Sequence, residues 1–307
     1  MSSDPIRFEP PSRPGDEGER ASDDDGGLRL WAALQEQHEP APGQSARLAE
    51  QRRRLAERVA ASARANRCMV TTRHAPAAMS RANDVARLQT LYLAAEGPLR
   101  PGEPLNVLLI ELAPDGVLPI EAPADGVQRE WLLLRGAVEL KSADHAVTLA
   151  PLDFHLEPAA LTDCAGDAAI AQLEADAAGA LLFLRESLTF PEPGAAPRTV
   201  RDADTPWEPF APRIERRLLW QSGATLGAVL LRAEAGARVP HHAHRHDEEC
   251  LVLRGETFQD DCLLREGDYQ LAPAGSEHKS VMTDVGGVFF IHGDLHLDLV
   301  VPPGPAA

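Results

Sequence analysis

The second half of the chain consists of short hydrophobic runs separated by turn-forming residues. The run CLVLRGE, residues 250–256, is aliphatic with little alternation, which is typical of a strand buried on both faces. Gly255 and Gly267 mark the turns that separate this run and the next. Runs of the same kind fill the first half from residue 69 onward. The pattern therefore predicts a mainly β fold over both halves.

The pattern is different before residue 69. Residues 1–43 are rich in Asp, Glu, Ser, Pro and Gly, so they cannot bury enough apolar surface to offset the entropy of ordering. We expect a disordered acidic tail there, with a short helix near residues 28–37. Residues 44–68 place Leu48, Leu55 and Val59 at helical spacing among many arginines, which predicts an Arg-rich amphipathic helix. Such a helix is either solvated and packed on its neighbour, or docks an acidic partner or a second subunit.

The two halves also repeat each other. The segment REWLLLRGAVEL, residues 129–140, aligns with EECLVLRGETF, residues 248–258. The segment LDFHLEPA, residues 152–159, aligns with GDYQLAPA, residues 267–274, and GALLFL aligns with GGVFFI further on. Recurrence of turns and strands in the same order indicates an internal duplication. We therefore expect one domain at residues 69–190, a Pro/Gly linker, and a second domain at residues 198–301.

The candidate metal-binding residues lie in the second domain. His242 and His244 are two residues apart, so in an extended strand both side chains lie on one face. Glu248 has the same parity, and His278 returns on a later strand. Imidazole nitrogens and a carboxylate oxygen are good ligands for borderline divalent metals. The spacing predicts a metal site formed by His242, His244, Glu248 and His278.

These residues carry a resemblance to a known family. The first motif of the cupin superfamily is similar to the spacing of Gly236, His242, His244, Glu248 and Gly255, and the second is similar to that of Gly267, Pro273, Gly275 and His278. Where the family has a closing asparagine, this chain has Met282. The sequence HDEECLVLRGE…GDYQLAPAGSEH most resembles the cupin half of ChrR-like anti-sigma factors. The resemblance implies tandem cupin barrels (double-stranded β-helices), the second with a 3-His/1-Glu metal site inside it.

Other interpretations of the histidine run remain open. His241, His242, His244 and His246 are also compatible with a solvated His-rich loop. A shift of register replaces His242 and His244 with His244 and His246, but then the glycine and glutamate spacings no longer fit. Glu249 is the rival of Glu248, and its parity points it to the opposite face. We expect pocket walls from Phe258, Tyr269, Met282 and Phe289.

The first domain lacks the metal residues. Its segment IEAPADG has no histidine where the second domain has His242 and His244, Arg129 stands in place of Glu248, and Asp163 in place of His278. A cation in place of a carboxylate ligand repels a metal ion. We therefore interpret residues 69–190 as a degenerate cupin. We also hypothesise that Arg129 and Asp163 pair across the barrel interior.

Composition narrows the functional classes. The net charge of −17 disfavours binding to nucleic acid or to an anionic membrane, because both are polyanions. No Cys-x-x-Cys pair supports a zinc ribbon or a thioredoxin-like centre. No signal peptide or long apolar run is present, so a cytoplasmic location is expected.

Two functions follow from the resemblance. The first is a metal-binding regulatory or sensor protein, with a sigma factor or another protein bound through the N-terminal helix. The zinc motif of that family's N-terminal domain is missing, because Pro42 and Ser45 follow His38 at the ligand spacing. The second is a cupin metalloenzyme, of the dioxygenase type, acting on a small organic molecule. Zinc is the metal expected first, with iron, manganese and nickel as alternatives, and the chain is expected to be a monomer or a homodimer.

Overall fold

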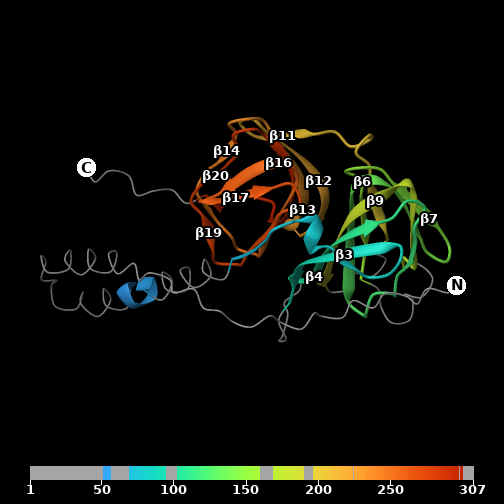
Figure 1. Cartoon of the computed structure of the whole chain (residues 1–307). Coiled ribbons are helices and arrows are strands. Elements are labelled where there is room, and N and C mark those ends of the chain that lie inside the picture. The colour runs from blue at the N-terminus through green and yellow to red at the C-terminus, as the bar shows by residue number, and fades with distance from the viewer. Residues whose placement is uncertain are drawn as a thin grey trace, which may run out of the picture. The chain divides into compact units, whose positions relative to one another are not determined.

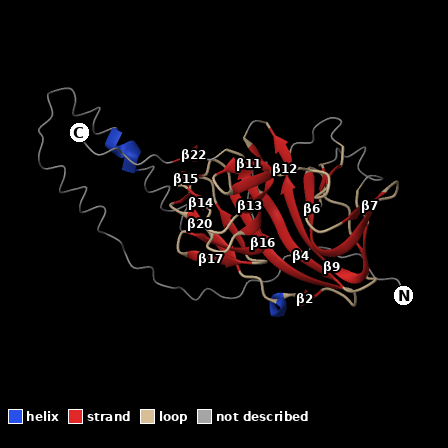
Figure 2. Cartoon of the chain, turned by 90° about the horizontal axis from the view of Figure 1, so that it is seen from above, coloured by secondary structure: helices blue, strands red, loops and turns tan. Residues whose placement is uncertain are grey.

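A computed structural model describes residues 51–56, 69–94, 102–159, 169–189, 196–223, 225–296 and 298–299. Within these ranges the chain is mainly β, as predicted, with strands in red and only short helical pieces in blue in Figure 2. The helical pieces are residues 51–56 and the 3-10 helix η1 (Pro76–Ala78). The predicted acidic tail and most of the predicted Arg-rich helix lie outside the described residues. No helix in the described ranges is long and apolar enough to cross a membrane.

The first barrel is an antiparallel sheet with the strand order β10-β8-β6-β9-β4-β3-β2. β5 pairs with β9, and β7 pairs with β6. Figure 1 shows most of these strands in cyan to yellow-green. Their bounds are β2 Ser80–Arg81, β3 Ala86–Leu93, β4 Pro104–Leu112, β5 Val117–Pro119, β6 Val127–Lys141, β7 Ala146–Leu149, β8 Phe154–Glu157, β9 Gln172–Leu188 and β10 Arg198–Val200.

The second barrel has the order β1-β18-β16-β21-β13-β12-β11, with β17 and β20 paired to β16 and β14 paired to β20. A small sheet, β19-β15-β22, closes one end. Most of these strands are orange to red in Figure 1. Their bounds are β1 Val70–Thr72, β11 Glu208–Ala211, β12 Ile214–Ser222, β13 Leu226–Ala233, β14 Arg238–Val239, β15 His242–Ala243, β16 Glu248–Gln259, β17 Cys262–Arg265, β18 Tyr269–Ala272, β19 Glu277–His278, β20 Val281–Met282, β21 Gly287–Asp294 and β22 Asp298–Leu299.

Equivalent glycines show how closely the barrels correspond. Gly136 in β6 and Gly255 in β16 both adopt positive φ, 80° and 78°. A Cβ on Gly136 would lie 1.8 Å from the carbonyl oxygen of Gly179, and a Cβ on Gly255 would lie 2.2 Å from that of Gly286. No side chain fits at either distance, so only glycine allows the crossing strands to approach. The same constraint at the same turn supports the internal repeat read from the sequence.

The two barrels exchange a strand. β1 precedes the first barrel in the chain but pairs with β18 of the second, Val70 opposite Leu271. β10 precedes the second barrel but pairs with β8 of the first, Arg198 opposite Leu156. The sequence segments TTRHA (71–75) and TVRDA (199–203) carry this exchange and are themselves a repeat. Each sheet is therefore completed by the other half of the chain.

A buried aspartate anchors each exchanged strand. Asp268 accepts hydrogen bonds from Arg73 Nη1 at 2.7 Å and from the backbone N–H of His74 at 2.8 Å. Asp153 accepts from Arg201 Nη1 at 2.9 Å and from the backbone N–H of Asp202 at 2.7 Å. Charge-assisted bonds of this kind are about twice as strong as neutral ones. Each exchanged strand is thus held at its end as well as along its edge.

A large apolar core is shared by both barrels. It includes Phe154 and Phe183 of the first barrel, and Tyr269, Leu251 and Phe290 of the second. The rings of Phe183 and Phe290 have centroids 5.0 Å apart and are tilted by 53°, which is a favourable aromatic geometry. These two residues occupy the same position in β9 and β21, so the contact lies on the axis of the internal repeat. Burial of these rings joins the barrels into one body.

A buried ionic network lies within this apolar core, at the contact between the barrels. Arg185 in β9 is fully buried and donates to Glu130 from Nη1 at 2.8 Å, to Glu249 from Nε at 2.8 Å and to the carbonyl of Gly102. Trp220 Nε1 donates to Glu130, and the hydroxyl of Tyr269 donates to Glu249, at 2.7 and 2.8 Å. Burial raises the pKa of Glu130, and the charge of Arg185 opposes this rise. Each buried charge therefore depends on its partners across the barrel–barrel contact.

His155 in β8 makes the folded state sensitive to acid. Its Nδ1 is 2.9 Å from the hydroxyl of Thr199 in the exchanged strand, and burial lowers its pKa from 6.5 to about 4. The equivalent residue in the second barrel is Gln270, which donates to Thr71 at 2.9 Å. Because the unfolded chain binds the proton more readily, this histidine stabilises the fold above pH 6.5 and loses that contribution as pH falls toward 4.

We predict that His155→Gln flattens the dependence of stability on pH in this window. The wild type should lose about 2–3 kcal/mol more than the variant between pH 7 and pH 4. Urea unfolding at several pH values measures the difference, and His296→Gln, at an exposed bend, is the control. Parallel pH profiles for wild type and His155→Gln would contradict the role given to this residue.

The buried ionic network gives a second prediction. Arg185→Met leaves the carboxylates of Glu130 and Glu249 buried without their cation, so the free energy of unfolding should fall by about 3–5 kcal/mol. Arg232→Met is the matched control, because Arg232 pairs with Glu215 at the surface and should cost about 1 kcal/mol or less. Replacing Glu130 and Glu249 by Gln in the Arg185→Met background should recover part of the loss. An equal loss of unfolding free energy in Arg185→Met and Arg232→Met would contradict this role of Arg185.

Candidate metal centre

Three strands, and the segment that follows one of them, bring the four predicted ligands together. His242 in β15 lies directly opposite His278 in β19 in the small closing sheet. His244 follows β15, and its backbone N–H bonds to the carbonyl of Ser276, which holds the two segments side by side. Glu248 is the first residue of β16. The structure thus gathers residues that are up to 36 positions apart in the sequence.

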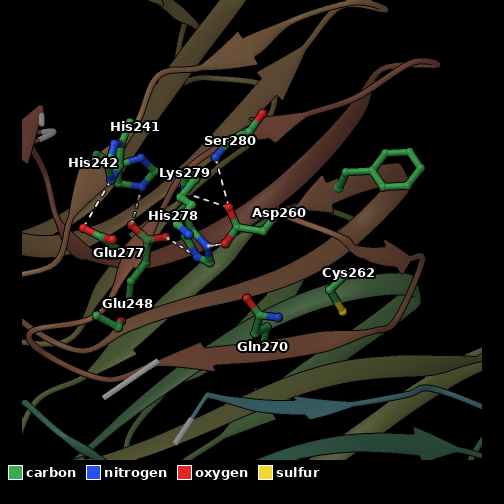
Figure 3. A network of polar contacts seen from close by, with 12 residues as sticks. His241, His242, Glu248, Asp260, Cys262, Gln270, Glu277, His278, Lys279 and Ser280 are labelled. Carbon is green, nitrogen blue, oxygen red and sulfur yellow. Dashed lines mark hydrogen bonds and ion pairs between the residues drawn. The ribbon is translucent and has the colours of Figure 1, made fainter. Parts of the chain in front are cut away.

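All three imidazoles turn the same ring nitrogen toward Glu248. The distances from Nε2 to the nearest Glu248 oxygen are 3.9 Å for His242, 3.6 Å for His244 and 3.9 Å for His278. Figure 3 shows His242 and His278 facing this carboxylate. Candidate ligand atoms of His242, His244 and Glu248 all lie within 4.8 Å of one another, and His278 joins the group through Glu248. Three nitrogens and a carboxylate therefore surround one small volume.

The opposite ring nitrogens are each held from behind. His242 Nδ1 is 2.8 Å from the carbonyl of Pro240, and His244 Nδ1 is 2.9 Å from Ser276 Oγ. His278 Nδ1 is 3.2 Å from Asp260, which also accepts from the backbone N–H groups of Lys279 and Ser280 (Figure 3). A hydrogen bond donated by Nδ1 fixes the tautomer that leaves a lone pair on Nε2, which is the arrangement found behind metal-binding histidines.

The electrostatics of the group centre on Glu248. Burial alone would raise its pKa, but the neighbouring imidazoles of His242, His244 and His278 lower the pKa to about 2. Burial lowers the pKa of His244. Burial also acts to lower the pKa of His242, but the nearby carboxylate of Glu248 outweighs it, and the pKa is raised. Glu248 therefore stays ionised at neutral pH, as a carboxylate ligand must.

One atom indicates directly that the group lacks a partner. His244 Nε2 is buried and makes no hydrogen bond among the described residues. A buried nitrogen lone pair without a donor costs free energy, and a cation at the centre of the group would remove that cost. Three imidazoles and one carboxylate also suit a borderline divalent metal ion. The residues present could therefore hold such an ion.

The rival residues named from the sequence face elsewhere. His246 Nδ1 binds Asp294 at 2.7 Å, and His241 Nε2 is 3.2 Å from Glu277. Glu249 points away from Glu248, to Arg185 in the first barrel. The alternation of side chains along β16 thus separates Glu248 from Glu249, as parity predicted.

The first barrel has a different cluster at the equivalent place. Arg129, in the position of Glu248, donates from Nε to Glu186 at 2.9 Å. Nearby, Glu157 accepts from Trp131 Nε1 at 3.2 Å and from a backbone N–H at 3.0 Å. A guanidinium and two carboxylates therefore stand where the second barrel has three imidazoles and one carboxylate. Asp163, the hypothesised partner of Arg129, lies outside the described residues, so that pairing stays a prediction.

A pocket of about 400 Å³, counted with its part open to solvent, opens inside the second barrel. Met282 and Phe289 line it, as expected from the sequence. Phe258 and Tyr269 do not line it, which corrects that part of the prediction. A bulge between Val252 and Arg254 changes the parity of β16, so Thr257 and Gln259 face the pocket instead of Phe258. Tyr269 lies in the core between the barrels, with its hydroxyl on Glu249.

Sequence reasoning also missed the residues behind the imidazoles. Asp260 lies between the two motifs, and Ser276 lies at a variable position inside the second. A single sequence gives no sign that either side chain touches a histidine. The available signal is the pair Asp260–Asp261 at the turn between β16 and β17, where a short polar side chain can bind backbone N–H groups.

Comparisons with known proteins agree with this fold. A family model described as the ChrR cupin-like domain matches residues 195–298. No curated protein matches the chain. Solved structures do match at low identity, which shows the fold alone.

Three of these structures illustrate the likeness. A proposed glyoxylate-induced protein from Pseudomonas aeruginosa has a TM-score of 0.58 at 13% identity, covering 76% of this chain and 92% of that one. A proposed dioxygenase from Nostoc punctiforme has a TM-score of 0.52 at 15% identity, covering 76% and 84%. A mutant of Bacillus subtilis oxalate decarboxylase has a TM-score of 0.54 at 14% identity, covering 74% and 78%. The chain thus has a tandem cupin fold, and its residues 195–298 are similar to the ChrR cupin-like domain.

Proposed function

We propose that this protein is a metal-binding regulatory or sensor protein whose second barrel holds one divalent ion through His242, His244, Glu248 and His278. The observation that carries the proposal is the shared orientation of the three imidazoles. Each directs Nε2 at Glu248 while Nδ1 is engaged behind it. Four ligands from four positions, with three supported from behind, are more than a solvated His-rich loop requires.

Zinc is the metal we propose first. Four protein ligands complete a tetrahedral shell around zinc and leave no open position, which suits a structural or sensing role. The match of residues 195–298 to the ChrR cupin-like domain supports the regulatory assignment. We further propose a cytoplasmic protein, monomeric or homodimeric, that reaches a protein partner such as a sigma factor through residues 44–68. Nucleic acid and membranes are not proposed as partners, because the net charge is −17.

A cupin metalloenzyme of the dioxygenase type is the second candidate. The pocket beside the proposed metal centre favours it, because a zinc-only structural site has no need of an internal cavity. Likeness to a proposed dioxygenase and to an oxalate decarboxylase supports only the fold. In this candidate an iron, manganese or nickel ion would keep open positions and supply Lewis-acid or redox chemistry. Glu248 could then hold or release a proton at its carboxylate oxygen.

Metal analysis of the full chain, purified without added metal, separates the two candidates. Tightly held zinc without oxygen uptake supports the regulatory protein, and copurification of a sigma factor supports it further. Iron or manganese together with oxygen consumption that depends on an added organic substrate supports the enzyme. A chain that holds no metal under any loading condition contradicts both.

The ligand set itself gives a prediction. His242→Ala and His278→Ala should each lower the bound metal from about one ion per chain to well below half, because each removes one of four ligands. His241→Ala and His246→Ala are matched controls from the same region, since these rings bind Glu277 and Asp294. Mass spectrometry of metal content after desalting measures the effect. Similar loss in all four variants would support a solvated His-rich loop instead.

The residue behind His278 gives another prediction. Asp260→Asn removes the carboxylate that holds His278 Nδ1, so metal affinity should fall by about 10–100-fold while the four ligands remain. Asp261→Asn, one residue further and exposed, should leave the affinity unchanged. Competition with a chromophoric chelator measures both. Unchanged affinity in Asp260→Asn would show that the carboxylate does not support the ligand.

A further inference from the structure

The two barrels have the same strands but differently filled interiors. The first barrel contains a dense apolar core that includes Trp131, Val138, Leu140 and Leu149. The corresponding cluster of the second barrel has only four buried members: Cys250, Val252, Leu264 and Phe289. Both clusters lie among described residues, so the difference comes from the side chains at matched positions.

Equivalent positions in the two barrels show which side chains leave space inside the second barrel. Trp131 lies two residues after Arg129 in β6, and Cys250 lies two residues after Glu248 in β16. β6 pairs with β8 in the same register in which β16 pairs with β18. Replacing an indole with a thiol removes most of the side-chain volume at that point. Val138 and Leu140 pair with β7, and their counterparts Thr257 and Gln259 pair with β17 in the same register. The second barrel is therefore hollow where the first is packed, and two of its apolar positions have become polar.

The pocket lies beside the proposed metal centre. Its lining includes Cys250, two residues beyond Glu248, and Val239, three residues before His242. Val281 also lines it, three residues beyond His278. Gln259 lines it and precedes Asp260, which holds His278.

The walls are mainly apolar. Ile214, Leu231, Val281, Phe289 and Ile291 give the pocket an aliphatic and aromatic surface. Thr257 uses its hydroxyl to donate to the carbonyl of Met282 at 3.2 Å. Gln259 is 4% exposed, and its Oε1 is buried without a hydrogen-bond partner among the described residues. A buried acceptor of this kind is costly unless something donates to it.

We propose that the interior of the second barrel binds a small, mainly apolar molecule that presents one hydrogen-bond donor to Gln259. The inference rests on the proposed function for its location, since this molecule would lie beside the metal centre. Burial of the apolar body supplies affinity, and the bond to Oε1 supplies selectivity for hydroxyl-bearing ligands. An anionic ligand is disfavoured inside the pocket, because Arg238 is the one cationic residue in the described lining and it is exposed.

Cyclohexanol and cyclohexanone test the proposal, since both have one six-membered ring and only the alcohol donates. Calorimetry or ligand-detected NMR with the zinc-loaded full chain should show about tenfold tighter binding of cyclohexanol. Gln259→Leu introduces the residue that the first barrel has at this position, Leu140, so the fold should tolerate it. In this variant the preference should fall to about one. Gln221→Leu, which alters an exposed glutamine in β12, should keep the preference.

A third variant tests the cavity itself. Cys250→Leu places a larger side chain where the first barrel has Trp131, and it should weaken both probes at unchanged zinc content. Three results would overturn the proposal: no binding of cyclohexanol, an unchanged preference in Gln259→Leu, or tighter binding of cyclohexanecarboxylate than of cyclohexanol. Zinc content is measured on every sample. A chain that holds zinc but binds no cyclohexanol therefore contradicts only this inference. A chain that holds no zinc contradicts the proposed function.

Discussion

Glu248 and Glu249 are neighbours in β16, and the alternation of side chains sends them to opposite faces of one strand. Glu248 faces three imidazoles inside the second barrel. Glu249 faces the first barrel, where Arg185 binds it without solvent, and it also accepts a hydrogen bond from Tyr269 of its own barrel. A shift of one residue would bury Glu248 against Arg185 and turn Glu249 toward the histidines. The ionic contact between the barrels therefore sets the register on which the candidate metal centre depends.

The exchange of β1 and β10 strengthens this coupling. Each strand completes the sheet of the other half, and each is fixed by a buried aspartate, Asp268 or Asp153. The first half has no histidine at the positions of His242 and His244, but it supplies Arg185, part of the shared apolar core and the strand β1. These contributions give the first barrel a structural role in the fold of the second. Its interior is filled by Trp131 and its apolar neighbours.

Much of the architecture could be predicted from residues alone. Alternating runs and turn glycines indicate the strands, and Gly136 and Gly255 mark one crossing that the repeat uses twice. The spacing of His242, His244, Glu248 and His278 was sufficient to predict that the four side chains converge. These features are local, or they recur twice, so one sequence contains enough information to find them.

Other features depend on contacts between distant residues. The bond from Arg185 to Glu249 joins positions 64 apart, and the pairing of Val70 with Leu271 joins positions 201 apart. Neither leaves a local pattern. The lining of the pocket was misjudged for a different reason. The bulge after Val252 inserts one residue, so counting by twos from Glu248 chooses Phe258 where the strand presents Thr257 and Gln259.

X-ray absorption spectroscopy of the metal-loaded chain tests the central claim most directly, because it reports the atoms bound to the ion. The account predicts one ion per chain with four nitrogen or oxygen ligands at about 2.0–2.2 Å, three of them imidazoles. Ligation by sulfur at about 2.3 Å, or a shell without imidazole, would place the ion elsewhere and contradict the account.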